Sequence, residues 1–282
     1  LAMNIVLPEL DGRLIARAIS FKAEASKTSD TEFTKIIHKP KEDRIGFVAD
    51  LAVNWVKLQR TPNKDKKLAL ILSDYPHKGG HQAYAVGLDT PASVIAIADE
   101  LKQSGYMIGD LPDSGALIHQ LTQGGYNEIL SAEHYHSLFM TLPPSFRESV
   151  IAAWGDVPKQ DFTFQLIISG TLLIALQPLR GTRDAQKNDY HDASRPPCHD
   201  YIAFYLWLTR FYQPHALIHC GTHGTLEWLP GKSVALSHSC APELLLGALP
   251  VLYPFIVNNP GEAAQAKRRL AAVTIGHLTP PL

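Results

Sequence analysis

The sequence predicts an α/β fold: parallel-sheet α/β units with helices on both faces. Short apolar runs that are typical of buried strands, such as residues 68–72 and 216–219, alternate with segments whose apolar residues recur at helical spacing, such as 43–60 and 92–105. The chain has 282 residues, of which 45% are apolar, so it can bury a large core. Because it begins without a usual start residue and stops without a helix cap or polar tail, we expect it to be part of a larger multidomain subunit.

We divide the chain into three approximate segments, 1–62, 63–160 and 161–282. The first is expected to form a strand at 5–7, a loop and the helix 43–60, whose apolar residues lie at helical spacing.

The second segment is expected to contain a buried strand at 68–72, a loop rich in glycine and histidine, and an amphipathic helix over 92–105. Thr90 is the predicted N-cap of this helix, and Asp89 is predicted to bond backbone donors near its start. A second short helix is expected over 113–121.

The third segment repeats the alternation of strands and helices. Its expected elements are one or two strands at 162–177, a helix at 199–212, a strand at 216–219, and a helix, a strand and a helix at 242–247, 254–257 and 261–272. Ligands of parallel α/β sheets bind outside the carboxyl ends of strands. We therefore expect a site where the loops 74–81 and 219–232 follow two of the strands.

Charge and cysteine content exclude several classes of protein. The 26 basic and 27 acidic residues give a formal net charge of −1, which lacks the basic excess of nucleic-acid binders. The three cysteines, Cys198, Cys220 and Cys240, are too few and too widely spaced for a disulfide framework or a paired zinc knuckle. No signal peptide or long apolar run is present. We therefore expect small buried cysteines and a cytoplasmic protein.

The densest group of reactive side chains lies in the sequence HCGTHGTLEWLPGK, residues 219–232. His219, His223 and Glu227 lie four residues apart and would share one face of a continuous helix, as a metal-binding triad does. The alternative is that His219 ends a strand, His223 is a solvated loop residue and Glu227 only favours a helix N-terminus.

Two glycines, Gly221 and Gly224, argue against the continuous helix. They favour a strand that ends at His219, a turn that lets the backbone approach a ligand, and a short helix that begins near Thr225. A zinc hydrolase is therefore the weaker hypothesis, because its H-E-x-x-H site requires an unbroken helix.

The sequence around Lys232 superficially resembles a phosphate-binding P-loop. That pattern requires a glycine where this chain has Leu226, and Pro230 removes a backbone donor from the cradle. We therefore exclude ATP hydrolysis by this chain.

Other polar residues allow both a functional and a structural interpretation. Arg180 and Arg183 can clamp carboxylates, or can belong to a solvated loop. His77 and His81 are expected to be exposed loop histidines, and the basic run 267–269 is expected to face solvent for the most part.

Several strings along the chain carry a resemblance to a known family. They are VLPELDGR (6–13), VGLDTPAS (86–93), QPLRG (177–181) with YHD (190–192), HCGTHGTLEWLPGK (219–232), LYPFIVNNPGEAAQAKRR (252–269) and HLTPP (277–281). On these strings the sequence resembles the chelatase large subunits, that is, the CobN type of cobaltochelatase and, more broadly, the H subunits of magnesium chelatase. Members of this family are several times longer, which implies that the chain is an internal piece.

The resemblance implies a subunit that binds a tetrapyrrole and its divalent metal, while AAA+ ATPase and adaptor subunits of the CobS/CobT type hydrolyse ATP. In the cobalt branch, Co²⁺ is the substrate metal and hydrogenobyrinic acid a,c-diamide the acceptor, in aerobic cobalamin synthesis. In the magnesium branch the acceptor is protoporphyrin IX. The segments 226–230 and 196–207 look closer to the cobalt branch, whereas 73–81 departs from the Asn/Arg-rich loop that the family leads us to expect.

The resemblance also implies roles for single residues. Glu227 is the first candidate for the catalytic proton acceptor and His223 the next, with His219, His223 and Glu227 as transient metal ligands. The expected substrate-binding residues are Arg180, Arg183, Trp228 and Lys232. Trp228 can stack on the macrocycle or pack in the core. The alternative function is a non-catalytic scaffold that binds tetrapyrrole or partner subunits.

Overall fold

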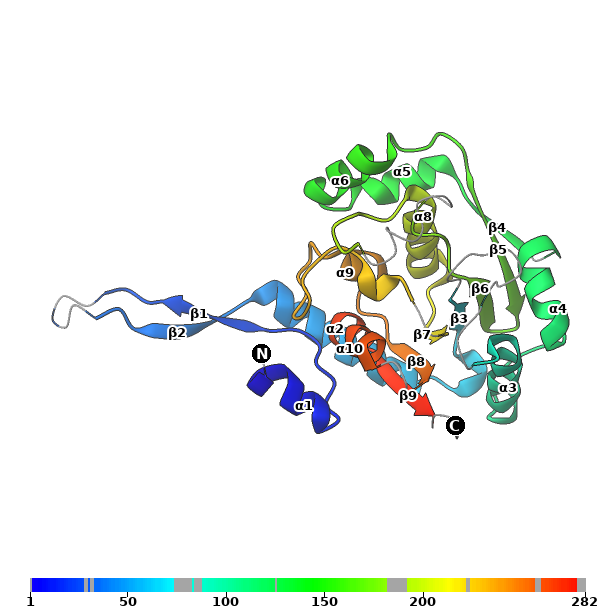
Figure 1. Ribbon diagram of the computed structural model, residues 1–282, viewed down its shortest axis with the longest axis horizontal. Helices are drawn as coiled ribbons and strands as arrows, with labels where there is room; N and C mark the ends of the chain where they lie inside the picture. The colour runs from blue at the N-terminus through cyan, green and yellow to red at the C-terminus, as the bar shows by residue number, and fades with distance from the viewer. Residues whose placement is uncertain are drawn as a thin grey trace.

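The chain forms one large sheet with helices on both faces and a projecting two-stranded arm (Figure 1). The structure, a computed structural model, describes residues 2–27, 30, 33–73, 83, 88–124, 126–181, 192–221, 224–256 and 260–277. Within them, seven strands pair in the order β4-β5-β6-β3-β7-β8-β9. These strands are β3 (Leu68–Leu72), β4 (Tyr126–Leu130), β5 (Phe162–Ser169), β6 (Leu172–Leu176), β7 (Ala216–Cys220), β8 (Val251–Ile256) and β9 (Val273–His277). All pairs except those made by β5 are parallel, which confirms the predicted fold class.

Helices cover both faces because side chains alternate along each strand. In β3, Ala69 and Ile71 pack into one core cluster, whereas Leu68, Leu70 and Leu72 pack into another. The first cluster lies under α5 (Ala132–Met140), α6 (Pro144–Trp154), α8 (His199–Trp207), α9 (Ala241–Leu246) and α10 (Pro260–Leu270). The second lies under α3 (Thr90–Gln103) and α4 (Ser114–His119). The strands of the central sheet are therefore buried on both faces, as their continuous apolar runs predict.

Most predicted elements are confirmed, and two differ. The segment predicted as a strand at 5–7 is helical, since η1 (Ala2–Val6) is followed by α1 (Leu7–Leu10). The N-cap of α3 is Asp89 rather than Thr90, because the Asp89 side chain accepts the Ala92 N–H at 3.0 Å. The predicted bonding role of Asp89 is thereby confirmed.

The remaining elements connect the strands or precede them. They are α2 (Glu42–Arg60), η2 (Asn63–Asp65), η3 (Gln120–Gly124), η5 (Leu208–Tyr212), which continues α8, and η6 (Leu226–Trp228). The large sheet takes strands from both 63–160 and 161–282, so these two segments share one core. The division into three units stays a prediction. Among the described helices, none combines the length and apolarity needed to cross a membrane.

The projecting arm is an antiparallel hairpin of β1 (Ser20–Glu24) and β2 (Ile36–Pro40), which extends from the body in Figure 1. Most of its side chains are exposed, so the arm lacks a core of its own.

Candidate functional site

The candidate site lies where the strand order changes direction. The chain runs from β3 to the strands on one side, β4 to β6, and then crosses to β7, β8 and β9 on the other. Ser73, just after β3, donates its backbone N–H to the carbonyl of Cys220, the last residue of β7, at 3.1 Å. The two strand ends that the sequence predicts for the site are therefore adjacent, at a topological switch point where α/β proteins bind ligands. The loop 74–81, with His77 and His81, lies outside the described residues.

Four neighbouring strands each place one polar side chain at this end of the same face. Gln177 follows β6, Ser73 follows β3, His219 lies in β7 and Tyr253 lies in β8. In each case the residue two positions earlier belongs to the core cluster under α8. Since side chains two positions apart share a face of a strand, the apolar core gives way to a polar row at the carboxyl ends of the strands.

His219 is a buried, neutral imidazole. Its side chain lies in the polar row, and the residue is 2% exposed. Nε2 lies 3.0 Å from the Ser73 hydroxyl oxygen, and the ring centroid lies 4.6 Å from that of Tyr253. Desolvation lowers the pKa of His219 to about 3. An imidazole that stays neutral at physiological pH is the form that binds a metal ion.

Glu227 is completely buried (0% exposed) in η6. Its Oε1 accepts the Gly224 N–H at 3.2 Å and the Tyr253 hydroxyl at 3.1 Å. Within the described part of the chain, Oε2 has no hydrogen-bond partner. Desolvation raises the pKa of Glu227 to about 7 although both hydrogen bonds act in the opposite direction. The carboxyl group therefore exchanges protons near neutral pH.

Gly221 and Gly224 allow these groups to approach one another. At Gly221, where φ is +144°, an added Cβ would lie 2.3 Å from Ser73 Oγ. At Gly224 an added Cβ would lie 2.5 Å from Glu227 Oε2 and 2.8 Å from both Glu227 Oε1 and His219 Nε2. Only glycine fits these two positions. His219 lies in β7 and Glu227 in η6, so the two residues do not share one continuous helix.

A second set of hydrogen bonds surrounds this pair. Thr225 donates its backbone N–H to Gln177 Oε1 at 3.1 Å and its hydroxyl to the Tyr201 oxygen at 2.8 Å. Gln177 in turn donates to the Tyr205 hydroxyl oxygen at 2.7 Å. These buried contacts fix the segment between Gly224 and Glu227 against α8.

Two buried arginines hold the backbone after Gly224. Arg269 in α10 donates to the carbonyls of Glu227 at 2.5 Å, Leu229 at 2.6 Å and Lys232 at 3.0 Å. Arg269 is 3% exposed, so the expectation that the run 267–269 faces solvent is wrong for this residue. Burial, as the largest influence, lowers its pKa.

Arg180 has a similar position on the other side of the loop. Its guanidinium donates to the carbonyls of Trp228 at 3.1 Å, Arg195 at 2.6 Å and Asp192. Its predicted role, to bind substrate carboxylates, stays a prediction, and the described contacts give it a role in positioning the loop.

Two of the other predicted site residues, Trp228 and Lys232, follow Glu227 in the described part of the chain. Trp228 is half-buried and donates its indole N–H to Glu262 Oε2 at 2.7 Å, and Lys232 is exposed. His223 and Arg183 lie outside the described residues. No group of three potential metal ligands occurs within the described ranges. Of the predicted metal ligands, the structure brings two together, His219 and Glu227.

The sequence did not single out several residues that the structure places here, notably Ser73, Tyr253, Gln177 and Arg269. A period-two pattern through Val251 and Tyr253 was the available signal for Tyr253. Arg269 lies in the basic run 267–269, but no sequence pattern distinguished it from its two neighbours as a site residue.

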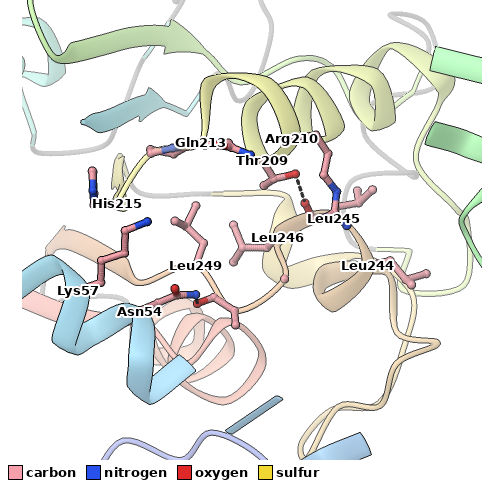
Figure 2. A pocket seen from close by; sticks show the side chains of 13 residues that line it. Asn54, Lys57, Thr209, Arg210, Gln213, His215, Leu244, Leu245, Leu246 and Leu249 are labelled. Carbon is pink, nitrogen blue, oxygen red and sulfur yellow. Dashed lines mark hydrogen bonds between the residues drawn. The ribbon is translucent and has the colours of Figure 1, made fainter. Parts of the chain in front are cut away.

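A separate cavity of about 320 Å³ lies at the opposite end of β7 (Figure 2). Lys57, Arg210 and His215 line it together with three leucines of α9 and with Leu249, which follows that helix. His215 immediately precedes β7. None of the predicted site residues lines it. The candidate site is therefore defined by its buried polar groups rather than by this cavity.

Several known proteins are similar to this chain. A family model described as CobN/Magnesium Chelatase matches residues 1–282. The chain is 42% identical to aerobic cobaltochelatase subunit CobN of Sinorhizobium sp and 44% identical to that of Pseudomonas aeruginosa, in each case over 100% of this chain but 23% and 24% of the relative. The H subunit of magnesium chelatase from Chlorobaculum parvum is 34% identical over 86% of this chain and 20% of that protein.

A solved structure is also similar. The catalytic subunit of cobaltochelatase from Mycobacterium tuberculosis superposes with a TM-score of 0.86 at 39% identity, over 98% of this chain and 25% of that one. The chain thus spans about a quarter of the length of the relatives that it matches.

Proposed function

The chain belongs to the CobN/magnesium chelatase family, and on this basis we propose that it forms the tetrapyrrole- and metal-binding region of an ATP-dependent cobaltochelatase. The proposed reaction inserts Co²⁺ into hydrogenobyrinic acid a,c-diamide. The proposed partners are AAA+ ATPase and adaptor subunits of the CobS/CobT type, of which the AAA+ subunits would hydrolyse the ATP, since this chain has no P-loop.

The observation that carries the proposal is the convergence of Glu227 and His219 beside Gly224. Insertion requires a base that takes N–H protons from the macrocycle and a ligand that holds the divalent ion without retaining it. Glu227, with a pKa of about 7, is a suitable base near neutral pH. Neutral imidazole suits Co²⁺, so His219 is a suitable transient ligand, with His223 as the proposed second one.

Both side chains are buried, so the macrocycle reaches them only after surrounding segments move apart. This requirement agrees with a reaction in which partner subunits supply energy from ATP hydrolysis. The same opening would change the pKa of Glu227. Exclusion of water raises this pKa, and entry of solvent would lower it again.

The test is cobalt insertion by the full-length protein with its partner subunits. Glu227→Gln keeps the size of the side chain and removes the base, so kcat should fall about 100-fold or more. Glu148→Gln, at an exposed position of α6, should leave kcat unchanged. Wild-type turnover by Glu227→Gln would contradict the assignment of Glu227 as the base.

The second candidate is magnesium insertion into protoporphyrin IX. It is favoured by the 34% identity to an H subunit of magnesium chelatase, but this value is lower than the 42% and 44% to the CobN subunits. Parallel assays with each metal and its macrocycle distinguish the two. Insertion of Mg²⁺ alone would overturn the cobalt assignment, and binding of macrocycle without insertion of either metal would favour a scaffold.

A further inference from the structure

A strongly basic recess lies between the projecting arm and the loop that follows the candidate site. Its volume is about 480 Å³. The lining consists of Phe21, Lys22, Ala23, Lys39, Pro40, Lys41 and Lys232. Four of these seven residues are lysines and none is acidic, so the recess is locally positive although the whole chain has a net charge of −1.

The register of the arm indicates which side chains share this recess. Phe21 pairs with Lys39, and Ala23 pairs with Ile37. Because alternate residues share a face, Phe21, Ala23 and Lys39 lie on one face of the hairpin, and Lys41 continues the same alternation beyond β2. Lys232, which is distant from the arm in the sequence, also lines the recess. Phe21 is 44% exposed and supplies an accessible aromatic surface.

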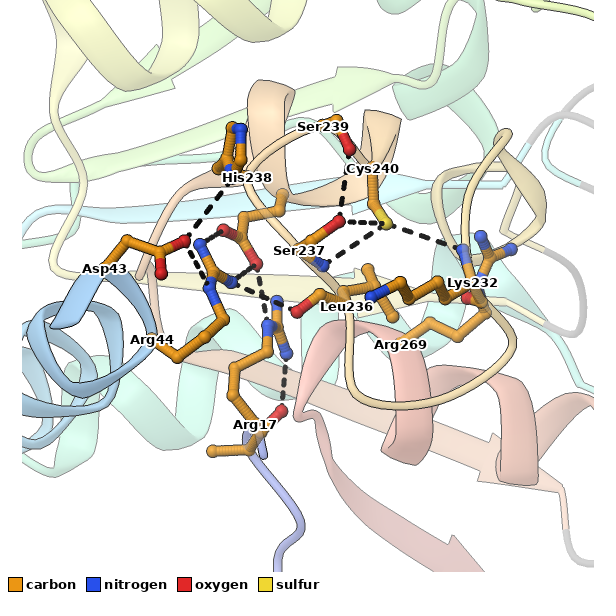
Figure 3. A network of polar contacts seen from close by, with 12 residues as sticks. Arg17, Asp43, Arg44, Lys232, Leu236, Ser237, His238, Ser239, Cys240 and Arg269 are labelled. Carbon is orange, nitrogen blue, oxygen red and sulfur yellow. Dashed lines mark hydrogen bonds and ion pairs between the residues drawn. The ribbon is translucent and has the colours of Figure 1, made fainter. Parts of the chain in front are cut away.

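Buried ion pairs fix the base of the arm on the body, as Figure 3 shows. Arg17 lies just before β1 and Arg44 just after β2, and both donate to the carboxylate of Glu243 in α9, at distances of 2.7 Å to 2.9 Å. Arg44 also donates to the carbonyl of Leu236 at 3.1 Å. The two ends of the arm are therefore anchored to the segment that follows Lys232, so the recess has a defined shape.

The recess is also connected to the candidate site. Arg269 binds the carbonyl of Lys232 and the carbonyl of Glu227 with the same guanidinium, and Figure 3 shows Arg269 beside Lys232. The lysine that borders the recess and the proposed base therefore belong to one rigidly held loop. A ligand at the recess is held by the same structural unit that positions Glu227.

We propose that this recess binds the peripheral carboxylates of the tetrapyrrole substrate, with Lys39, Lys41 and Lys232 as the cations and Phe21 as an apolar contact for the ring edge. Ammonium groups attract carboxylates, and none of the seven described lining residues carries a carboxylate that would compete. The inference rests on the proposed function and adds a preference for macrocycles with many carboxylates over macrocycles with few.

The test uses commercially available porphyrins that share a ring and differ in acidic groups. Binding of the octacarboxylate uroporphyrin and of the dicarboxylate mesoporphyrin to the full-length protein is measured by fluorescence quenching. Wild type should bind uroporphyrin more tightly, with an affinity that falls as salt rises. The triple variant Lys39→Gln, Lys41→Gln, Lys232→Gln should raise the Kd of uroporphyrin about 10-fold and change that of mesoporphyrin less than about 3-fold.

The matched control is a second triple variant, Lys35→Gln, Lys64→Gln, Lys159→Gln, which removes the same charge at exposed positions outside the recess. It should bind both porphyrins as wild type does. An equal loss of uroporphyrin affinity in both triple variants would indicate a general charge effect and would overturn the recess proposal. An unchanged Kd of uroporphyrin in the recess variant would also overturn it.

Turnover separates this inference from the proposed function. In the cobalt insertion assay, the recess variant should raise KM about 10-fold with little change in kcat, whereas Glu227→Gln should lower kcat. If Glu227→Gln abolishes insertion and the recess variant leaves KM unchanged, the recess proposal fails and the proposed function stands. If wild type neither binds a tetrapyrrole nor inserts cobalt, the proposed function itself fails.

Discussion

Glu227 and His219 approach the same point from opposite sides of a turn: the two carboxylate oxygens of Glu227 and Nε2 of His219 all lie within 2.8 Å of the place where a Cβ on Gly224 would stand. One group titrates near neutral pH and the other remains neutral down to acidic pH. A proton on Glu227 and a metal ion on His219 would therefore compete for nearly the same space. In the proposed reaction, this proximity would couple proton transfer to metal release.

Gly224→Ala should disrupt the site without removing any functional group. The new Cβ would overlap both Glu227 and His219, so these side chains must shift. Overpacking of this kind costs about 1–3 kcal/mol of stability, and displacement of catalytic groups by about 1 Å costs about 100-fold in rate. Urea unfolding and cobalt insertion measure the two effects.

Gly46→Ala is the control for Gly224→Ala. Gly46 lies inside α2, and a Cβ there would meet nothing within 4 Å. Alanine is the better helix former by about 0.5–1 kcal/mol, so this variant should be slightly more stable and fully active. A fully active Gly224→Ala protein would show that the tight turn is not needed for the reaction.

Glu227 should make the protein less stable as pH rises from about 4.5 to about 7. Its pKa is raised from 4.5 to about 7 by burial, so the folded state favours the protonated form. The stability associated with this group is complete below about pH 4.5 and is lost as pH rises to about 7, by a total on the order of 3 kcal/mol. Glu227→Gln should remove this loss.

The difference between wild type and Glu227→Gln isolates the effect, because His219 acts in the opposite direction. The pKa of His219 is lowered from 6.5 to about 3, so its stabilising contribution is present above about pH 6.5 and is lost as pH falls towards 3. Both proteins contain His219. The unfolding free energy of wild type relative to the variant should decline between about pH 4.5 and 7, and a difference independent of pH would refute the raised pKa.

Tyr253→Phe should shift the pH dependence of the reaction. The Tyr253 hydroxyl donates to Glu227 Oε1 and accepts the Gly224 N–H at 2.8 Å. Its hydrogen bond is one of the influences that lower the pKa of Glu227, so its loss should raise that pKa further. The pH of half-maximal insertion should move upward, and unfolding should become easier by about 1–2 kcal/mol.

Tyr212→Phe provides the comparison for Tyr253→Phe. The Tyr212 hydroxyl donates to the carbonyls of Leu68 and Thr171, at the far end of β3. This variant should lose a similar amount of stability with no change in the pH profile. Equal pH profiles for wild type and Tyr253→Phe would show that the Tyr253 hydroxyl does not affect the pKa of the base and that Tyr253 contributes only to packing.

The site could be predicted from sequence where local patterns determine it. The continuous apolar runs at 68–72 and 216–219 identify β3 and β7. The rule that ligands gather at the carboxyl ends of parallel strands then points to the loops 74–81 and 219–232, and so to His219. The two glycines after His219 identify the tight turn. Glu227 is predicted to lie near the turn because the short helix that contains it begins directly after the turn.

The rest depends on tertiary contacts that no local pattern records. The strand predicted at 254–257 is β8, Val251–Ile256, and its later predicted start left out Tyr253. The three charges of 267–269 cannot share one helix face, but the sequence does not tell which of them points inward. The arm β1–β2 was missed because its exposed strands contain no continuous apolar run, although Phe21 and Ala23 alternate with polar residues in β1.

Arg269→Lys should loosen the loop that carries Glu227 while it keeps the positive charge. A single ammonium group cannot reach the three carbonyls that the guanidinium binds, those of Glu227, Leu229 and Lys232. Buried carbonyls that lose their donor destabilise the fold by about 3 kcal/mol in total. Because the loop connects the proposed base with the basic recess, kcat should fall and KM for the tetrapyrrole should rise together.

Arg268→Lys, one residue earlier in α10, tests whether any arginine of this helix has the same effect. Arg268 forms its ion pair with Glu9 at 2.8 Å, and its side chain is partly exposed. Such pairs contribute about 0–1 kcal/mol, so this variant should keep both kinetic constants and most of its stability. If Arg268→Lys and Arg269→Lys lose activity equally, the loss comes from a general disturbance of α10. The hydrogen bonds of Arg269 to the three loop carbonyls are then not its cause. If only Arg269→Lys loses activity, the position of Glu227 depends on a buried arginine from another part of the sequence. This dependence would explain how a carboxylate in a short helix after a glycine-containing turn can have a fixed geometry.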